Sequence, residues 1–434
     1  MKQLTELATP FASIAENKQL VGADLVWLND LRLQALNEFD QNGLPAKKQE
    51  DWKYTSLWAL TQQEFSHNAE TSKLSTSQCE QLALLKECYR VVIVDGVFSE
   101  LHSQIEGLQK GLTINSLSSG LDHVQSHLGQ QIDIEKSGFN ALNTLLMNDG
   151  VVITVDKNIK VSKSIEILVV NTGKTDNLAT HLRHVIVLDE KSEATVIEHY
   201  VALTEATSFT NVVTEVVLAE NAELNHYKLQ QESLNTTHIA TLAAKQAAGS
   251  QWKTNSISLG AKLARNDVHT QLLGEQAHVV MDGLYLPINE QHVDFHTRID
   301  HVVPNTTSDE LFKGVIDDKA HGVFNGKVIV HKDAQKTDSN QQNHNLLLSR
   351  SCEIDSKPEL EIYADDVKCA HGSTVGQMNE DHLFFLRSRG LDEVSARSLL
   401  TYAFAVEVLE RIPAKDIREA LSAVIEERLP QGGK

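Results

Sequence analysis

Residues 185–224 read VIVLDEKSEATVIEHYVALTEATSFTNVVTEVVLAENAEL, and they contain one small turn pattern twice. The two copies are Glu190-Lys191-Ser192-Glu193-Ala194 and Glu220-Asn221-Ala222-Glu223-Leu224, each after a β-branched run. A third copy is Glu275-Gln276-Ala277-His278-Val279, and Lys245-Gln246-Ala247-Ala248 is a weaker one. The copies start 30, 25 and 30 residues apart. Imperfect repetition at such a period is typical of stacked repeat folds.

Short β-branched runs recur around these turns, and helical periodicity is weak between them. The runs cover residues 151–155, 165–170, 185–188, 212–218 and 328–330. Many short strands without intervening helices favour a stacked β-solenoid. A β-sandwich also has short strands at steady spacing, so the pattern favours the solenoid and leaves the sandwich as the alternative.

Helical patterns flank the β-rich part. Apolar residues recur at three- and four-residue steps between residues 24 and 39, as one buried helix face requires, and Gly43 ends the pattern. A short helix is predicted over residues 139–147. After Gly376 three helices are predicted, the first capped by Asn379 or Asp381, the second by Asp392, and the third starting at Pro413.

These patterns divide the chain into four regions. We predict a helical N-terminal region (1–75), a mixed α/β connecting region (76–150), a β-helix core (151–376) and a helical C-terminal domain (377–434). The fold class is therefore mainly β. The C-terminal domain is small, and we expect it to pack on the end of the solenoid or on a partner.

Charge and targeting signals exclude several functional classes. The chain has 39 Lys plus Arg against 59 Asp plus Glu, a net charge of −20, which disfavours nucleic acid and anionic membranes as partners. No window approaches the roughly 20 apolar residues of a membrane span. Residues 1–7 lack the apolar core of a signal peptide, so we expect a cytoplasmic location.

The sequence Lys368-Cys369-Ala370-His371-Gly372 is the first candidate site. In an extended strand the period of two places Cys369 and His371 on one face. A thiol and an imidazole are good ligands for iron or zinc, but two ligands do not close a metal site. A small buried thiol and a hydrogen-bonded strand-end imidazole explain the same residues without function.

The sequence from His292 to Arg298 is the second candidate. His292, Asp294, His296 and Arg298 alternate with apolar residues, so they share one face of a strand. The His-x-Asp-x-His spacing could bind a divalent ion. A strand with one wet face and an imidazole–carboxylate ladder is the favoured interpretation. His181 and His184 are expected in a solvated polar connection, and the chain has no phosphate-binding loop or nucleophilic-serine motif.

A longer series of motifs spans roughly residues 45–412. It comprises Glu50-Asp51-Trp52-Lys53-Tyr54-Thr55, Ala141-Leu142-Asn143, Phe295-His296-Thr297, His301, Pro304, Thr307-Ser308, Gly326, residues 333–338, Gln341, residues 346–348, Pro358, residues 360–372, residues 386–391 and Ala396-Arg397. Together they resemble the SufB/SufD family of iron–sulfur cluster assembly proteins. The short N-terminal region, the few cysteines and the short helical tail are similar to the SufD branch.

The resemblance implies a right-handed parallel β-helix (β-solenoid) with a helical N-terminal region and a small helical C-terminal domain. It also implies a complex with a SufB-like paralogue and a SufC-like ABC ATPase. By the same resemblance, the β-helices of the paralogues would pair, and a nascent cluster would form at their interface with a cysteine from SufB and a histidine from SufD. The matching histidine is His371, with Cys369 beside it, and Lys368 and Gly372 are candidates for the partner interface.

The resemblance further implies that the C-terminal helices dock the ATPase. The docking candidates are Arg387, Arg389, Gly390 and Leu391. An iron–sulfur cluster or iron would be held transiently at the shared interface and not stably by this chain alone. A flavin in the complex is left open, and no enzymatic activity is expected of the chain itself.

Other functions remain compatible with the residues. A SufB-like paralogue, or a homodimeric scaffold without cluster chemistry, would use the same strand edges for pairing. A β-helix enzyme acting on polysaccharides would need charged side chains along an open groove, for which the His292–Arg298 face is the candidate.

Overall fold

The computed structural model describes residues 20–67, 69–70 and 74–429, so residues 1–7, on which the leader prediction rests, lie outside the described part. The first elements are α1 (Val26–Asn42), the 3₁₀ turn η3 (Glu50–Trp52), α2 (Trp58–Thr61), α3 (Thr76–Leu82), β1 (Tyr89–Val94), β2 (Val97–Phe98), β3 (Leu112–Ser116), α4 (Leu117–Val124) and α5 (Gly138–Leu146). The predicted helices at 24–39 and 139–147 correspond to α1 and α5.

Sixteen strands then follow without a helix between them. They are β4 (Val151–Val155), β5 (Ile165–Asn171), β6 (Leu178–Leu188), β7 (Glu193–Ala202), β8 (Ser208–Leu218), β9 (Glu223–Gln231), β10 (Thr236–Gln246), β11 (Gln251–Ser258), β12 (Leu263–Leu272), β13 (His278–Tyr285), β14 (His292–His301), β15 (Thr307–Ile316), β16 (His321–Val330), β17 (Asp338–Leu347), β18 (Glu353–Ile362) and β19 (Lys368–Gln377). Three helices end the described chain: α6 (Glu380–Ser388), α7 (Glu393–Glu410) and α8 (Lys415–Arg428).

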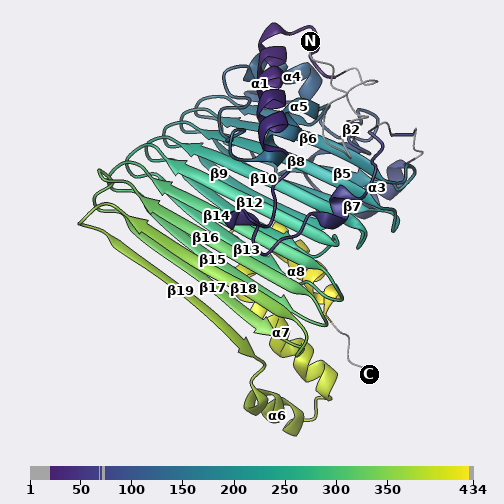
Figure 1. The fold of residues 1–434 in the computed structure, drawn as a ribbon, viewed down its shortest axis with the longest axis vertical. Coiled ribbons are helices and arrows are strands. Elements are labelled where there is room, and N and C mark those ends of the chain that lie inside the picture. Colours follow the sequence, from purple (N-terminus) through teal and green to yellow (C-terminus); the bar gives the residue numbers. More distant parts are fainter. Residues whose placement is uncertain (1–19, 68, 71–73, 430–434) are drawn as a thin grey trace.

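Successive strands alternate between two sheets, and from β4 onward each pairs in parallel with the strand two places along the chain. One sheet has ten strands, from β19 to β2, and the other has nine, from β18 to β3. The sixteen strands, two to a turn, make about eight turns (Figure 1). The predicted parallel β-solenoid is therefore confirmed, and the sandwich alternative is wrong.

The repeated turn pattern forms one stacked corner of the solenoid. Lys191, Asn221 and Gln276 have φ of 58°, 57° and 63°, and Gly249 has φ of 67° at the corner between them. Glycine and asparagine adopt this left-handed conformation at low cost. The weaker copy at residues 245–248 is therefore misplaced by three residues. Gly249 occupies the position predicted for Gln246, which instead ends β10.

The interior of the solenoid is a continuous apolar core. Tyr285, Phe295, Phe312 and Phe324 stack along it with ring centroids 5.7, 5.2 and 5.0 Å apart, and all four are fully buried.

The prediction of a solvated connection at His181 and His184 is wrong, because both histidines lie in β6 and are buried. Between them Arg183 is fully buried and forms an ion pair with Glu215 at 2.8 Å. Alternation within a strand cannot show that the outward-facing side chains are covered by another part of the chain.

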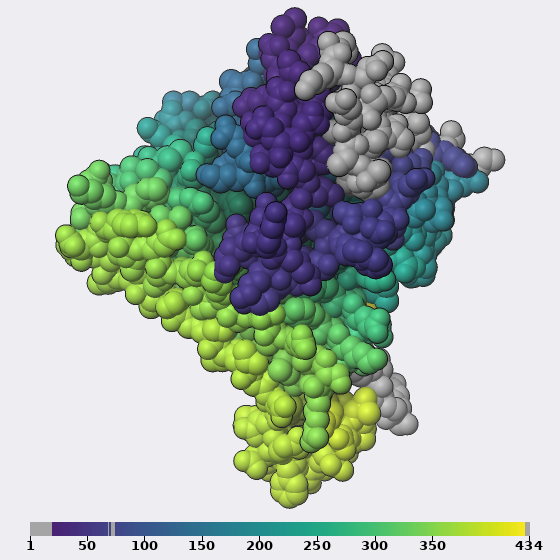
Figure 2. Space-filling view, in the orientation of Figure 1, coloured from purple at the N-terminus to yellow at the C-terminus, as the bar shows by residue number. Residues whose placement is uncertain are grey.

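The two ends of the chain cover the outer faces of the two sheets. The N-terminal helices pack on the nine-stranded sheet, where Phe39 and Phe139 share a core with Phe209 of β8. In Figure 2 this N-terminal part (purple) lies over the middle of the visible face. Helices α7 and α8 pack on the ten-stranded sheet, where Leu409 and Leu421 join its outer apolar residues.

The C-terminal helices thus cover a sheet face, and the predicted packing on the end of the solenoid is wrong. The predicted caps at Asn379 and Asp392 are confirmed, whereas the third helix starts two residues after Pro413, with Ala414 as its N-cap. Within the described residues, no helix is long and apolar enough to cross a membrane.

Candidate functional site at the open end of the solenoid

The last turn leaves two strand edges unpaired. β19 pairs only with β17, and β18 pairs only with β16, so no described strand adds to the outer edge of either. Almost every side chain of β19 is exposed, in contrast to the buried strands behind it. Unpaired N–H and C=O groups on such an edge are ready to pair with another chain. Figure 1 shows β19 and β18 at this free end, beyond which only α6 and part of α7 extend.

Cys369, His371 and Ser373 face the interior at this end, which we call the lumen mouth. The half-buried Cys369 packs against the core. The Ser373 hydroxyl lies 2.7 Å from the hydroxyl of Ser356 on β18, across the mouth. His371 lies between them on β19 and is exposed. The common face predicted from the period of two is observed.

Lys368 and Gly372 lie on the other face of β19. Both are exposed, and a Cβ atom built on Gly372 would meet no atom within 4 Å. The outer face of the edge strand is therefore open beside His371, and the missing side chain of Gly372 lets another backbone approach closely.

Two buried polar side chains lie directly behind His371. Glu310, Gln341 and His371 are register partners on β15, β17 and β19, so their side chains stack on one inner face. Gln341 Nε2 donates a 2.6 Å hydrogen bond to Glu310 Oε2. Burial raises the pKa of the Glu310 carboxyl to about 7, and the hydrogen bond from Gln341 opposes that rise.

A chain of hydroxyl groups lies behind Cys369. Its register partner Ser339 accepts a hydrogen bond of 2.8 Å from Ser308, whose hydroxyl lies 2.9 Å from Nε2 of the buried His301. Burial, together with the nearby carboxylate of Asp338, raises the pKa of the Cys369 thiol. The spacing of residues in the sequence could not reveal the buried side chains behind His371 or those behind Cys369, because these side chains come from strands far apart in the chain.

The mouth is short of metal ligands. No group of three or more His, Cys, Asp or Glu side chains suited to a metal ion occurs among the described residues. A thiol and an imidazole at an open surface are one soft and one borderline type of ligand, and these two alone would not complete a metal site.

The second predicted site is not a wet face. Asp294 is fully buried under the N-terminal segment, where it accepts a hydrogen bond from Thr55 at 2.5 Å and one from Arg265 at 2.9 Å. His296 lies 3.1 Å from the same carboxylate, so the predicted imidazole–carboxylate pairing is confirmed. The guanidinium of Arg265 also lies 3.8 Å from the ring centroid of Trp52. These contacts attach the N-terminal segment to the sheet and cover Asp294 and Arg265.

The predicted ATPase-docking residues lie at the turn between α6 and α7. Arg387 forms an exposed ion pair with Glu393 at 3.5 Å, and the guanidinium of Arg389 lies 4.9 Å from the Phe385 ring centroid. Gly390 has φ of 98°, which lets the chain reverse there. Leu391 packs inward against the apolar cluster of α6 and α7.

The sequence analysis overlooked two aromatic residues on α6. Phe384 and Phe385 are 74% and 55% exposed. Large apolar side chains at such exposure beside two arginines are typical of a protein-binding surface. Their hydrophobicity was visible in the sequence, but their exposure was not.

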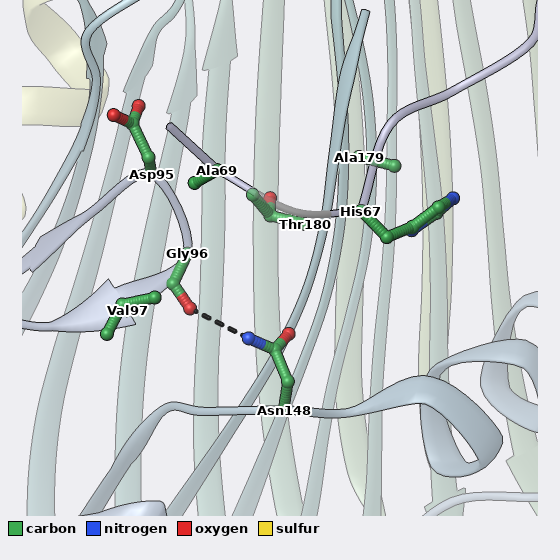
Figure 3. Close-up of a pocket in the computed structure, with 8 residues that line it drawn as sticks. All are labelled: His67, Ala69, Asp95, Gly96, Val97, Asn148, Ala179 and Thr180. Atoms are coloured by element: carbon green, nitrogen blue, oxygen red, sulfur yellow. Dashed lines mark hydrogen bonds between the residues drawn. The ribbon is translucent and has the colours of Figure 1, made fainter. Parts of the chain in front are cut away.

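A shallow pocket of about 200 Å³ lies at the opposite end of the molecule (Figure 3). Two of its polar side chains form hydrogen bonds: Asn148 donates to the Gly96 carbonyl at 3.2 Å, and Asp95 accepts from Thr172 at 2.6 Å. His67 stacks on His181 with ring centroids 5.5 Å apart. The amide oxygen of Asn148 is buried and has no partner among the described residues.

Comparison with known families identifies the family of the chain. The model described as "SUF system FeS cluster assembly, SufBD core domain" matches residues 170–404, and the SufBD protein N-terminal region matches residues 10–167. The chain belongs to the SufBD family. The core match includes the whole lumen mouth, so the open end lies within the part that defines this family.

Three relatives are similar over most of their length. The iron–sulfur cluster assembly protein SufD of Escherichia coli is 35% identical over 92% of this chain and 93% of its own. An iron–sulfur cluster assembly SufBD family protein of Synechocystis is 32% identical over 96% and 94%. The chloroplastic protein ABCI7 of Arabidopsis thaliana is 32% identical over 86% and 80%. The chain is thus a SufD-like member of the SufBD family and belongs with the SUF system of iron–sulfur cluster assembly.

Proposed function

We propose that this chain is a SufD-like subunit that contributes His371 to a nascent iron–sulfur cluster site shared with a SufB-like paralogue. The observation that supports this most is the position of His371, exposed on an unpaired edge strand beside the half-buried thiol of Cys369. Its register partners Gln341 and Glu310 on the same inner face are buried, whereas His371 is exposed at a surface that another chain can reach.

Edge pairing brings the partner's ligands to this histidine. A paralogue with the same fold has its own terminal edge strand, and two such edges can pair through backbone hydrogen bonds. Lys368 and Gly372 then lie at the contact, and the exposed outer face of Gly372 accommodates the partner's backbone. Cys369 is a second ligand or a sulfur-binding neighbour in the same site.

The ligand chemistry suits iron as the cargo of the site. A neutral imidazole nitrogen and a thiolate are both ligands that bind iron. The absence of a third ligand in the described part of the chain is the reason why one subunit would hold a cluster only transiently.

The C-terminal helices are the proposed attachment for a SufC-like ABC ATPase. Arg387, Arg389, Phe384 and Phe385 present charge and apolar area on α6, beyond the last turn. Helix α7 also touches β15 and β13, which lie two and three strands behind the edge strand β19 in the ten-stranded sheet. A nucleotide-driven movement of these helices can therefore reach the lumen mouth and open the interface between the subunits.

The test is cluster assembly in the three-subunit complex. The His371→Ala variant, co-expressed with the SufB-like and SufC-like partners, should retain less than about a tenth of the iron and acid-labile sulfide of the native complex, because one ligand is lost. The matched control is His344→Ala, which removes the imidazole on the neighbouring strand that lies 2.8 Å from Thr374 instead of facing the mouth. Unchanged iron and sulfide in the His371→Ala complex contradicts the ligand role.

A homodimeric scaffold without cluster chemistry is the second candidate. The same unpaired edges that suit a paralogue also suit a second copy of this chain. Size-exclusion mass measurement with and without the SufB-like partner separates the two. A homodimer whose mass does not change when the SufB-like partner is added supports the homodimeric scaffold and contradicts the shared cluster site.

A further inference from the structure

The amide of Gln341 is held in one orientation directly behind His371. Gln341 is fully buried, and its Nε2 donates to Glu310 Oε2 at 2.6 Å. Above pH 7 the Glu310 carboxyl is ionised and can only accept, so the NH₂ group of the amide must face it. The carbonyl oxygen Oε1 is then fixed on the other side of the amide.

That carbonyl oxygen is buried and has no hydrogen-bond partner within the described residues. A buried acceptor without a donor costs free energy, so an orphan at this place calls for an explanation. The amide group of Gln341 is also closely packed. Its Nε2 lies against Gly326 on the opposite sheet, where only a residue without a side chain leaves room for the amide. A Cβ atom on Gly326 would lie 2.5 Å from Gln341 Nε2.

The register places His371 next in this column. Gln341 and His371 are paired residues of the parallel strands β17 and β19, with side chains on the same inner face. Neighbouring strands lie about 4.8 Å apart, which brings an imidazole N–H within hydrogen-bonding reach of the amide. His371 belongs to the exposed edge strand, whereas Gln341 and Glu310 belong to the closed interior.

We infer that Gln341, oriented by Glu310, positions His371 by accepting a hydrogen bond from one ring nitrogen through Oε1. The other ring nitrogen is then unprotonated and faces the lumen mouth as the metal-binding atom. This inference rests on the proposed ligand role of His371 and adds the two residues that prepare it. Gln341 and Glu310 are positioning residues, since neither touches the cluster itself.

The chemical consequence is control of the tautomer. A neutral imidazole carries one proton on either of its two nitrogens, and only the bare nitrogen binds a metal. An acceptor fixed behind the ring selects one tautomer and one ring orientation, as the outer partners of metal-bound histidines do. Without that acceptor an exposed histidine samples both tautomers and several rotamers.

The test measures the His371 tautomer directly in the full chain without metal. Nitrogen-15 spectra of histidine-labelled protein near pH 8 report the proton on each ring nitrogen, and a His371→Gln difference spectrum assigns the signal. The native chain should show one tautomer favoured by about fivefold or more, as one hydrogen bond with a net strength of about 1 kcal/mol gives. Gln341→Met, which keeps length and burial, should reduce that ratio to within about threefold.

A second variant and a control distinguish a specific loss of the hydrogen bond to His371 from a general destabilisation of the edge strand β19. Glu310→Gln keeps the volume but allows the Gln341 amide to turn over, so it should also weaken the preference. Gln246→Met is the control, because Gln246 is a fully buried glutamine on β10, in the middle of the other sheet and away from β19. The His371 signal should be unchanged in this control. A single tautomer that persists in Gln341→Met or in Glu310→Gln overturns the inference, as does equal loss in Gln246→Met.

The tautomer measurement can fail independently of the cluster-assembly test of the proposed function. The tautomer is read in the isolated chain, whereas the ligand role is read from iron and sulfide in the complex. A full loss of cluster in His371→Ala with an unchanged tautomer in Gln341→Met contradicts only the positioning role. Normal cluster assembly in His371→Ala contradicts the ligand role whatever the tautomer.

Discussion

His301 shows how a single buried side chain links the stability of this fold to pH. Its Nδ1 lies 2.8 Å from the Thr306 hydroxyl and its Nε2 lies 2.9 Å from the Ser308 hydroxyl, with no exposure to solvent. Burial lowers the pKa of its imidazole to about 4, although the carboxylate of Asp300 opposes that shift. The unfolded chain binds a proton at this residue near pH 6.5, so acid between pH 6.5 and 4 favours unfolding.

We expect His301→Gln to remove this part of the acid sensitivity. A glutamine can still bond the two hydroxyl groups but does not titrate, so the native chain should lose about 2 to 3 kcal/mol more stability than the variant between pH 7 and 4.5. Urea unfolding at both pH values measures the difference. The exposed His382→Gln variant is the control, and equal acid losses in the native and His301→Gln chains would rule the explanation out.

The spacing of residues in the sequence correctly predicted part of the candidate site, and it missed the buried side chains behind it. The period of two correctly put Cys369 and His371 on one face, because it depends only on local strand geometry. It could not place Gln341 or Glu310 behind them, since that contact depends on the register of three stacked strands. The burial of Asp294 was also missed, because the covering residue Thr55 comes from the distant N-terminal segment.

At the scale of elements, α7 is attached to the solenoid by a partly buried ion pair. Arg411 follows the last turn of α7, and its Nε lies 2.9 Å from Asp282 on β13. Asp282 is 4% exposed, and burial raises its pKa to about 7 even though Arg411 pulls in the opposite direction. Removing the guanidinium leaves a buried carboxyl without its cation, which is costly.

Arg411→Ala should therefore lower the free energy of unfolding by about 1 to 3 kcal/mol at pH 8, where the carboxyl is charged. Denaturant midpoints measure the change. The double variant Arg411→Ala/Asp282→Asn should recover part of the loss, because the amide carries no charge. A midpoint in Arg411→Ala equal to that of the native chain contradicts this account of how α7 is held.

The corners of the solenoid and the C-terminal helices show which features of the fold a local sequence pattern can predict. The turn pattern found the corners at Lys191, Asn221 and Gln276, because one residue there must adopt a positive φ. The corner at Gly249 was missed by three residues, since alanines and polar residues around it fit more than one register. The predicted end-on packing of the C-terminal helices failed because the sequence does not show which apolar sheet face they cover.

For the whole molecule, the two ends of the solenoid differ in how far other elements cover them. The N-terminal helices cover one sheet, α7 and α8 cover the other, and β1 to β3 close the first end of both sheets. The last turn ends in the edge strands β18 and β19 of 10 residues each, with His371 at the mouth between them, whereas the edge strands at the first end, β2 and β3, have only 2 and 5 residues. Figure 1 shows the helices placed so that this end stays accessible. The central claim is therefore that β19 is the interface with a SufB-like partner.

Hydrogen–deuterium exchange of β19 with and without that partner tests this claim most directly. The amides of β19 that face away from β17 are unpaired in the isolated chain and should exchange at least about tenfold more slowly in the complex, because pairing protects them. Peptides from β10, in the middle of the nine-stranded sheet, are the internal control. Protection of β19 with unchanged exchange in β10 is the predicted result. A complex that forms without slowing exchange anywhere in residues 368–377 would contradict the account.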